Sequence, residues 1–315
     1  MTSAVVFAYH NVGVRCLSVL LAHGIDVPLV VTHRDAAGEK IWFESVAALA
    51  GRSGIACATP DDPNAPEFVG RIRSLAPDFA FSFYYRQMLK PEFLALAPRG
   101  AFNMHGSLLP KYRGRVPVNW AIIHGERETG ATLHEMVARP DAGRIVDQQC
   151  VPILPDDTAL EVFNKVTVAA EIVLDRSLPG LVSGTARLRA QDLSQGGYFG
   201  ARRPEDGRID WSQAARSTHD LVRAVAPPYP GAFCQLDGRT LRVLRTRLSR
   251  EAASADGPAI YVRGGRCLAT CGDGAVLELE SLELDGKPFA AREFLAIFGD
   301  RAIVPPSPAG PSGTP

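Results

Sequence analysis

The stretch GAFNMHGSLLPKYRG, which runs from Gly100 to Gly114, decides how the first half of this chain is expected to fold. Its first residues are apolar and follow a glycine, which predicts a buried strand over residues 101–105. Side chains alternate along a strand, so Asn103 and His105 project from one face and Met104 from the other. The turn-rich basic segment that follows is expected at the carboxyl end of the strand, where open α/β sheets bind their ligands.

Asn103 and His105 together suit acyl transfer, because an amide can stabilise an oxyanion and an imidazole can move a proton. A third candidate, Asp141, lies in a Pro/Gly-punctuated turn between the apolar stretches 131–137 and 145–153. A carboxylate close to His105 would favour the imidazolium form and fix the tautomer of the ring. Taken singly, each residue is more often structural: a turn asparagine, a hydrogen-bonded core histidine and a turn aspartate.

Apolar strands and helical patterns alternate over the first two hundred residues. The predicted strands cover residues 5–8, 27–31, 55–58, 79–83 and 101–105, and the predicted helices cover residues 12–22, 43–50, 65–75 and 159–174. This alternation predicts an α/β fold with a doubly wound, mostly parallel sheet. Residues 131–137 and 145–153 are expected to form a hairpin on its edge. The first turn, residues 9–13, lacks the three-glycine dinucleotide fingerprint, so a nicotinamide cofactor is not expected.

Composition shifts near residue 195, which predicts two domains in this chain of 315 residues. The predicted parts are a catalytic domain over 1–195, a linker over 196–207, a second domain over 208–304 and a disordered tail over 305–315. Beyond the linker, a helix over 214–225 is followed by short strands separated by glycine turns, a pattern typical of a small barrel. Those strands are predicted over 232–236, 241–246, 259–262, 267–270 and 276–282.

Composition also excludes several classes of protein. The chain is 46% hydrophobic and 22% charged, and 34 Lys and Arg residues balance 34 Asp and Glu residues. This is the profile of a globular protein without a net field that would draw it to polyanions. No run reaches the roughly 18 apolar residues of a membrane span, and the start lacks a signal-like pattern, so we expect a cytoplasmic protein with no membrane partner. The six scattered cysteines are expected to be free thiols, and no metal site is expected.

The order Asn-x-His at 103–105, Ser-Leu-Leu-Pro-x-x-Arg-Gly at 107–114 and Asp-Ala-Gly at 141–143 resembles the 10-formyltetrahydrofolate-dependent formyltransferases. This family includes glycinamide ribonucleotide, methionyl-tRNA and nucleotide-sugar formyltransferases. The chain resembles in particular the formyltransferase domain of the bifunctional polymyxin-resistance protein, which formylates UDP-4-amino-4-deoxy-L-arabinose in lipid A modification. The matching segments are residues 5–10, 81–86, 105–115, 136–143, 199–200, 222–226, 230–233 and 271–274.

The resemblance implies a role for each candidate. Asn103 would stabilise the transition state, His105 would transfer the proton, and Asp141 would act on the histidine. The implied co-substrate is 10-formyltetrahydrofolate, with no metal. Its implied contacts are Gln87, Met88, Leu89, Arg115, Val137, Ala138, Arg139, Pro140 and Asp141. The match at 87–89 is by position rather than by identity.

The implied acceptor is a UDP-linked amino sugar, whose diphosphate needs cationic or hydrogen-bonding donors. Candidates for this role are Lys111, Tyr112, Arg113, Arg202 and Arg203. The structural alternative for residues 202 and 203 is a solvated linker.

Three alternatives stay open: a methionyl-tRNA acceptor, another nucleotide-linked amino sugar, and a silent protein that only binds folate or a nucleotide sugar. A tRNA binder should carry a basic footprint. Residues 205–315 instead hold 13 Lys and Arg residues against 14 Asp and Glu residues, so a nucleic-acid partner is not expected. The residues do not indicate an oligomeric state. We expect any oxidative decarboxylation of the sugar to need a separate protein.

Overall fold

The computed structural model describes residues 1–35, 38, 41–254 and 256–306. The chain divides into two compact units. The first comprises Met1–Pro117, Glu128–Pro152 and Phe163–Gly200, and the second comprises Val118–Arg127, Ile153–Val162 and the chain from Ala201 onward. The predicted limits of the domains and linker stay a prediction. The predicted disordered tail lies, from residue 307 onward, outside the described residues.

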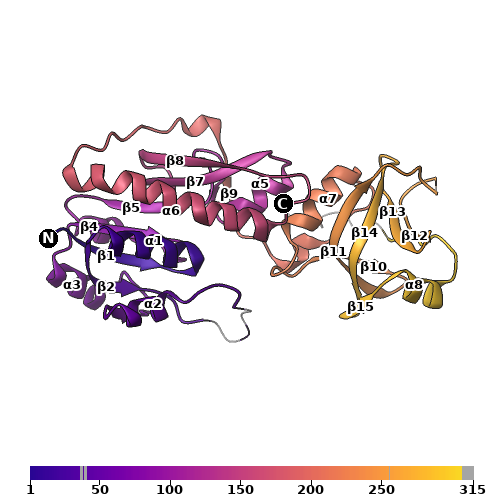
Figure 1. The fold of residues 1–315 in the computed structure, drawn as a ribbon, viewed down its shortest axis with the longest axis horizontal. Coiled ribbons are helices and arrows are strands. Elements are labelled where there is room, and N and C mark those ends of the chain that lie inside the picture. The colour runs from indigo at the N-terminus through magenta and orange to yellow at the C-terminus, as the bar shows by residue number, and fades with distance from the viewer. Residues whose placement is uncertain (36–37, 39–40, 255, 307–315) are drawn as a thin grey trace, which may run out of the picture. The chain divides into compact units, whose positions relative to one another are not determined.

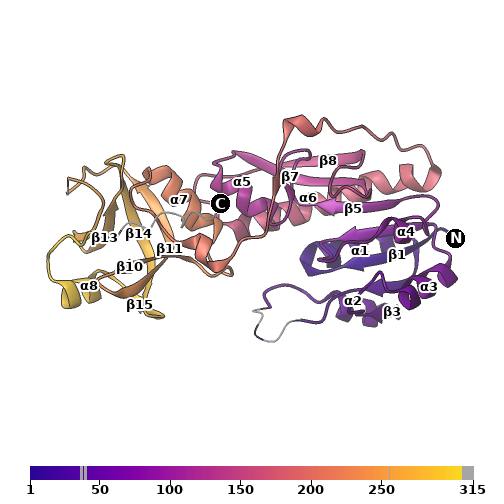
Figure 2. The same ribbon diagram turned by 180° about the vertical axis from the view of Figure 1, so that it is seen from behind.

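The first unit is built on a seven-stranded sheet of order β3-β2-β1-β4-β5-β7-β8 (Figure 1). Its strands are β1 (Ser3–Ala8), β2 (Asp26–Val31), β3 (Ala56–Ala58), β4 (Phe79–Phe83), β5 (Ala101–His105), β7 (Glu128–Glu135) and β8 (Ile145–Pro152). The strands from β3 to β5 are parallel, and β7 and β8 form an antiparallel hairpin on the edge next to β5 (Figure 2). The predicted doubly wound, mostly parallel sheet is therefore confirmed, and so is the edge hairpin.

Helices cover the central strands, which explains why β1 is a continuous apolar run. The helices of this unit are α1 (His10–Ala22), α2 (Val46–Arg52), α3 (Pro66–Leu75), α4 (Pro91–Leu94) and, from Phe163 onward, α6 (Ala159–Ser183). Phe7 of β1 shares a core cluster with Ile72 of α3 and Phe93 of α4. Arg15 of α1 pairs with Glu171 of α6, and the two helices lie side by side (Figure 1). Because every residue over 4–8 is fully buried, both faces of β1 must be covered.

Helix α6 is longer than predicted. The predicted helix ends at residue 174, but the helix continues to Ser183 with Pro179 inside it. Leu178 and Leu181 keep the apolar spacing of the helix and are buried. Their packing outweighs the loss of one backbone donor at the proline. Of the helices in the described part of the chain, none is long and apolar enough to cross a membrane.

The second unit contains an antiparallel sheet of order β10-β11-β14-β13-β12, with β15 paired to β14. These strands are β10 (Ala232–Leu236), β11 (Arg239–Ser249), β12 (Ala259–Arg263), β13 (Arg266–Thr270), β14 (Val276–Leu284) and β15 (Lys287–Phe289). The sheet curls into a half-barrel (Figure 1), which confirms the predicted barrel-like architecture. The accompanying helices are α5 (Pro117–Ile123), α7 (Ala215–Ala224) and α8 (Ala291–Phe298). Strand β15 and helix α8 were not predicted, and they close the core with Phe289, Phe294 and Phe298.

Short elements lie around residue 200. A two-stranded parallel sheet joins β6 (Arg113–Gly114) to β9 (Tyr198–Phe199) within the first unit. Two 3-10 turns cover Leu193–Gln195 and Pro204–Gly207. The β6–β9 pairing brings the segment before residue 200 back to the loop that follows β5.

Candidate active site

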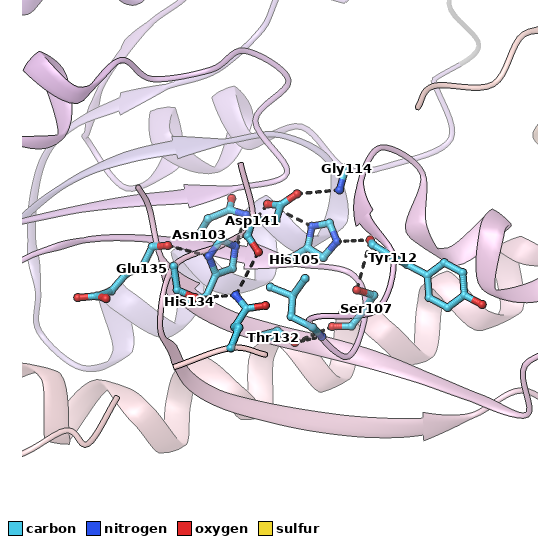
Figure 3. Close-up of polar contacts among 12 residues, drawn as sticks. Asn103, His105, Ser107, Tyr112, Gly114, Thr132, His134, Glu135 and Asp141 are labelled. Carbon is cyan, nitrogen blue, oxygen red and sulfur yellow. Dashed lines mark hydrogen bonds and ion pairs between the residues drawn. The ribbon is translucent and has the colours of Figure 1, made fainter. Parts of the chain in front are cut away.

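The candidate site lies on one face of β5 and β7 (Figure 3). The strand register places Asn103 opposite His134 and His105 opposite Thr132. Residues that face each other on adjacent strands point to the same side of the sheet, so these four side chains share one face. Met104 points to the other side and is 1% exposed. The alternation predicted from the sequence therefore holds.

The amide of Asn103 is oriented by His134. The Nδ1 atom of His134 lies 2.8 Å from the carbonyl oxygen of Glu135, which can only accept, so Nδ1 carries a proton. In the neutral ring, Nε2 is then an acceptor. The Nδ2 atom of Asn103 lies 3.1 Å from this Nε2 and donates to it. One N–H of the Asn103 amide is thus hydrogen-bonded to His134, and the second N–H can donate a hydrogen bond to a substrate.

Both ring nitrogens of His105 face acceptor atoms. Nε2 lies 2.8 Å from the carbonyl oxygen of Tyr112, to which it donates. Nδ1 lies 3.6 Å from Oδ1 of Asp141. A carboxylate at this distance stabilises a positively charged ring, because the two charges attract in a largely buried setting. The ring is 6% exposed.

Asp141 brings two distant parts of the chain together. Its Oδ1 lies 3.6 Å from His105 and 3.5 Å from Nε2 of His134, and its Oδ2 accepts a 2.8 Å hydrogen bond from the backbone N–H of Gly114. Burial alone would raise the pKa of this carboxyl group. The charge of His105 in its protonated form, the hydrogen bond and charge that His134 supplies only when its ring is protonated, and the Gly114 N–H instead hold its pKa well below the ordinary value. Asp141 has a φ of 51°, a left-handed conformation that aspartate tolerates better than most residues.

Hydrogen bonds to β7 and β8 hold the loop that presents these backbone groups. Thr132 donates to the carbonyl oxygen of Ser107 over 2.6 Å and accepts from the N–H of Leu109 over 3.1 Å. Gln148 of β8 donates to the carbonyl oxygen of Leu109 over 2.8 Å. Gly114 has a φ of 101°, and an added Cβ would lie 2.2 Å from the carbonyl oxygen of Phe199. A glycine is therefore required where the chain donates to Asp141.

The residues implied as folate contacts lie in two loops and at one exposed arginine. Residues 87–89 follow β4, where Gln87 donates to the carbonyl oxygen of Asp61 over 2.9 Å and Leu89 is buried. Residues 137–141 connect β7 to β8, and the side chains at 137–139 are exposed. Arg115 is exposed, and its backbone N–H donates to Phe199. The folate roles of these residues stay predictions.

The five predicted diphosphate contacts do not share one environment. Lys111 is exposed, whereas Tyr112 and Arg113 are buried, and the guanidinium of Arg113 donates to the carbonyl oxygens of Leu193 and Gly196. The remaining two arginines belong to the second unit. There Arg202 lies 4.9 Å from the ring centroid of Trp120, and the N–H of Arg203 donates to Asp206. Their predicted roles stay predictions too.

His134 is the participant that the sequence did not single out. It is 2% exposed, and it contacts both Asn103 and Asp141. Its signal was its place two residues after Thr132 in a strand with alternating faces, but only the β5–β7 register shows which residue it faces. The backbone groups of Tyr112 and Gly114 left no signal, since any residue carries them. Within the described residues, His, Cys, Asp and Glu side chains form no group of three that could hold a metal ion.

Solved structures of formyltransferases share this fold. The N-formyltransferase from Helicobacter canadensis, determined with folinic acid and dTDP-3-aminofucose, is 19% identical, with coverage of 92% of this chain and 100% of that one and a TM-score of 0.71. The sugar 3N-formyltransferase WlaRD, determined with dTDP and 5-N-formyl-THF, is 20% identical over 88% of this chain and 97% of that one, with a TM-score of 0.70. A sugar N-formyltransferase from a Shewanella species is 20% identical over 81% and 99%, with a TM-score of 0.62.

Two successive parts of the chain match two family models. The formyl transferase model matches residues 19–178, and the model of the formyl transferase C-terminal domain matches residues 202–299. The first match contains β5, the β7–β8 hairpin and the groups around Asp141, and the second contains the curled sheet. Since the first match alone spans more than half of the chain and the second follows it in order, this protein belongs to the formyl transferase family.

Proposed function

We propose that this enzyme transfers the formyl group of 10-formyltetrahydrofolate to the amino group of a nucleotide-linked amino sugar. The observation that carries the proposal is the contact of one amide, two imidazoles and one carboxylate around Asp141. An oxyanion donor beside a proton-transfer group is what formyl transfer to an amine requires. Two solved structures of similar fold support this choice of reactants, because they contain folate derivatives together with dTDP or a dTDP-linked amino sugar.

The proposed reaction begins with attack of the neutral sugar amine on the formyl carbon. A C–N bond forms, and the formyl oxygen becomes an oxyanion that accepts a hydrogen bond from the second N–H of the Asn103 amide. The bond between that carbon and N10 of the folate then breaks, which gives tetrahydrofolate and the formamide. His105 carries the proton from the amine to N10. To do so, one ring nitrogen must leave its present partner, either the Tyr112 carbonyl oxygen or Asp141, and contact the substrate. Asp141 stabilises the ring while it is charged.

The proposed folate contacts are the loops at 87–89 and 137–141, with Arg115. A pterin presents ring donors and acceptors at its edge, and a loop backbone can match such a pattern through its own N–H and carbonyl groups. The exposed loop 137–139 leads directly into Asp141. A folate bound along this loop would therefore lie next to the carboxylate and the two rings.

For the acceptor, we propose UDP-4-amino-4-deoxy-L-arabinose, which would place the protein in lipid A modification and polymyxin resistance. The support is the residue match over 5–10, 81–86 and 105–115 to the corresponding formyltransferase domain. Lys111, an exposed cation in the loop that follows β5, would bind the phosphates. A second candidate is a different nucleotide-linked amino sugar, which is favoured by the dTDP-linked ligands of the neighbours.

An acceptor screen tests the proposal. The full chain is mixed with 10-formyltetrahydrofolate and, separately, UDP-4-amino-4-deoxy-L-arabinose, dTDP-linked 3- and 4-amino sugars and charged initiator tRNA, and release of tetrahydrofolate is measured. Turnover with the UDP-sugar supports the full proposal. Turnover with a dTDP-sugar alone corrects the acceptor, and turnover with tRNA alone overturns the sugar assignment. Binding of folate and a sugar nucleotide without turnover in any arm would indicate a silent binding protein.

A further inference from the structure

Residues 191–199, which we call the strap, hold the loop that presents the Gly114 N–H to Asp141. The last two residues of the strap form β9 and pair with β6. The guanidinium of Arg113 donates to two strap carbonyl oxygens, those of Leu193 and Gly196, over 3.3 and 3.1 Å. Arg113 is 5% exposed, so these hydrogen bonds are largely shielded from water. One end of the strap thus fixes the position of the Gly114 donor.

The other end of the strap contacts the turn that carries Asp141. Nε2 of Gln191 lies 3.1 Å from the carbonyl oxygen of Asp141 and 2.6 Å from that of Gly143. Carbonyl oxygens only accept, so the amide must present its NH₂ group to both. Both acceptor oxygens lie on the carboxyl-terminal side of the Cα of Asp141, the residue whose φ is 51°. Gly143 is itself packed so closely that an added Cβ would lie 2.0 Å from the carbonyl oxygen of Glu135.

The opposite end of the same amide is buried without compensation. Oε1 of Gln191 has no hydrogen-bond partner among the described residues. Burying an unpaired carbonyl oxygen destabilises the folded state. The unpaired oxygen makes Gln191 costly for the stability of the fold. What its amide contributes is the pair of hydrogen bonds that it donates to the Asp141 turn.

We propose that Gln191 is a positioning residue for the carboxylate of Asp141. Its amide holds the backbone of the turn in the left-handed conformation, so that Oδ2 reaches the Gly114 N–H and Oδ1 faces the two imidazoles. The strap thereby sets the distance between Asp141 and His105 from both sides. This inference rests on the proposed function for its kinetic consequence, but not for its structural one.

The variant Gln191→Glu tests this role with almost no change in side-chain size. It places a carboxylate oxygen where the NH₂ group was, against two carbonyl oxygens, so that attraction becomes repulsion. The matched control is Gln195→Glu, in the same strap, because Gln195 is exposed and its side chain donates to Asp192 over 3.4 Å rather than to the Asp141 turn. If Gln191→Glu does not fold, Gln191→Ala removes the donors without adding charge.

The structural readout is amide hydrogen exchange measured by NMR. When the carboxylate moves away, the Gly114 N–H loses its acceptor and should exchange at least about tenfold faster. The N–H of Arg115 donates to Phe199 instead and should keep its wild-type rate. The control variant should change neither rate. An unchanged Gly114 rate, or an equal rise at both amides, would overturn the proposal, because the latter indicates general loosening of the loop.

The kinetic readout is a double-mutant cycle. Gln191→Glu should lower kcat about tenfold or more with little change in KM. In an Asp141→Asn background the same substitution should cost nothing further, since the two residues act through one carboxylate. An equal loss in both backgrounds would overturn the proposal. If the wild type transfers no formyl group to any acceptor, the proposed function fails, and the exchange rates still decide the role of Gln191.

Discussion

At the scale of single residues, one carboxylate oxygen faces two rings. Oδ1 of Asp141 lies within 3.6 Å of both His105 and His134, while Oδ2 is occupied by the Gly114 N–H. His134 in turn orients the amide of Asn103. A change at any of these side chains therefore alters the others, and their mutational effects should not be additive.

Loss of the amide or of the proton carrier should remove most of the turnover. We expect Asn103→Ala and His105→Ala each to lower kcat at least about a hundredfold with modest effects on KM, because both act on the reacting atoms. Steady-state release of tetrahydrofolate measures this. His23→Ala, which removes an exposed ring paired with Asp175, is the control and should retain wild-type turnover. Near-normal kcat in either test variant would remove its assignment.

Asp141→Asn should change the pH dependence as well as the rate. Oδ1 of Asp141 lies 3.6 Å from Nδ1 of His105, and a carboxylate at this distance stabilises a protonated ring. A neutral amide in its place removes that stabilisation. The acid limb of the pH–rate profile should therefore move to lower pH while the maximum falls. A profile that falls in height without moving would show that the carboxylate is not coupled to the titrating group.

Substitution of His134 should separate its hydrogen bond from its bulk. His134→Leu leaves the Asn103 amide without its acceptor, and we expect a loss of about ten- to a hundredfold in kcat. His134→Gln offers a side-chain oxygen to the same amide and should restore part of that rate. Parallel kcat and KM measurements on the two variants test this. Equal rates for leucine and glutamine would mean that Asn103 is oriented by other contacts.

At the scale of elements, the register of β5 against β7 builds the site. A shift of one residue would place Leu133 or Glu135 opposite Asn103 and turn His134 to the other face. The strand β5 was predictable from its apolar run, and the hairpin from its two alternating stretches. The register was not, because it depends on long-range pairing that a single sequence does not encode locally.

Helix α7 gives the second unit a pH-sensitive element. His219 is buried and binds Thr246 and the carbonyl oxygen of Pro155. Burial is the main cause that lowers its pKa from 6.5, with Arg223 acting in the same direction, while Pro155 and two nearby aspartates, 156 and 220, oppose it. The unfolded chain therefore binds a proton at a higher pH than the folded chain does. Stability is full above about pH 6.5 and decreases as the pH falls below it.

This dependence can be measured by urea unfolding at several pH values, followed by the fluorescence of the buried Trp211. The free energy of unfolding should fall from pH 8 to pH 5 in the wild type and fall less in His219→Gln. The exposed His124, in the same unit, provides the control substitution His124→Gln, which should keep the wild-type dependence. If the slope is unchanged in His219→Gln, the dependence arises from other groups.

At the scale of the whole molecule, the sequence predicted the architecture better than its details. Local patterns were sufficient for the parallel strands, the edge hairpin and the half-barrel, because the spacing of apolar residues along each element reflects which of its faces is buried. Helix α6 continues past its predicted end because Leu178 and Leu181 stay buried beyond residue 174, and their packing outweighs the backbone donor lost at Pro179. The Asn103, His105 and Asp141 set came from a spaced motif. His134 and Gln191 were missed because their partners lie at distant positions and only the folded chain brings them together.

The two backbone groups that hold Asp141 and His105 have a consequence for mapping the site. The Gly114 N–H and the Tyr112 carbonyl oxygen belong to the main chain, so truncating a side chain leaves both in place. An alanine scan would record Tyr112 only through its ring and Gly114 only through a steric clash. Replacing the amide that precedes the Cα of Gly114 with an ester, by chemical ligation, is the substitution that removes the donor and leaves every side chain in place.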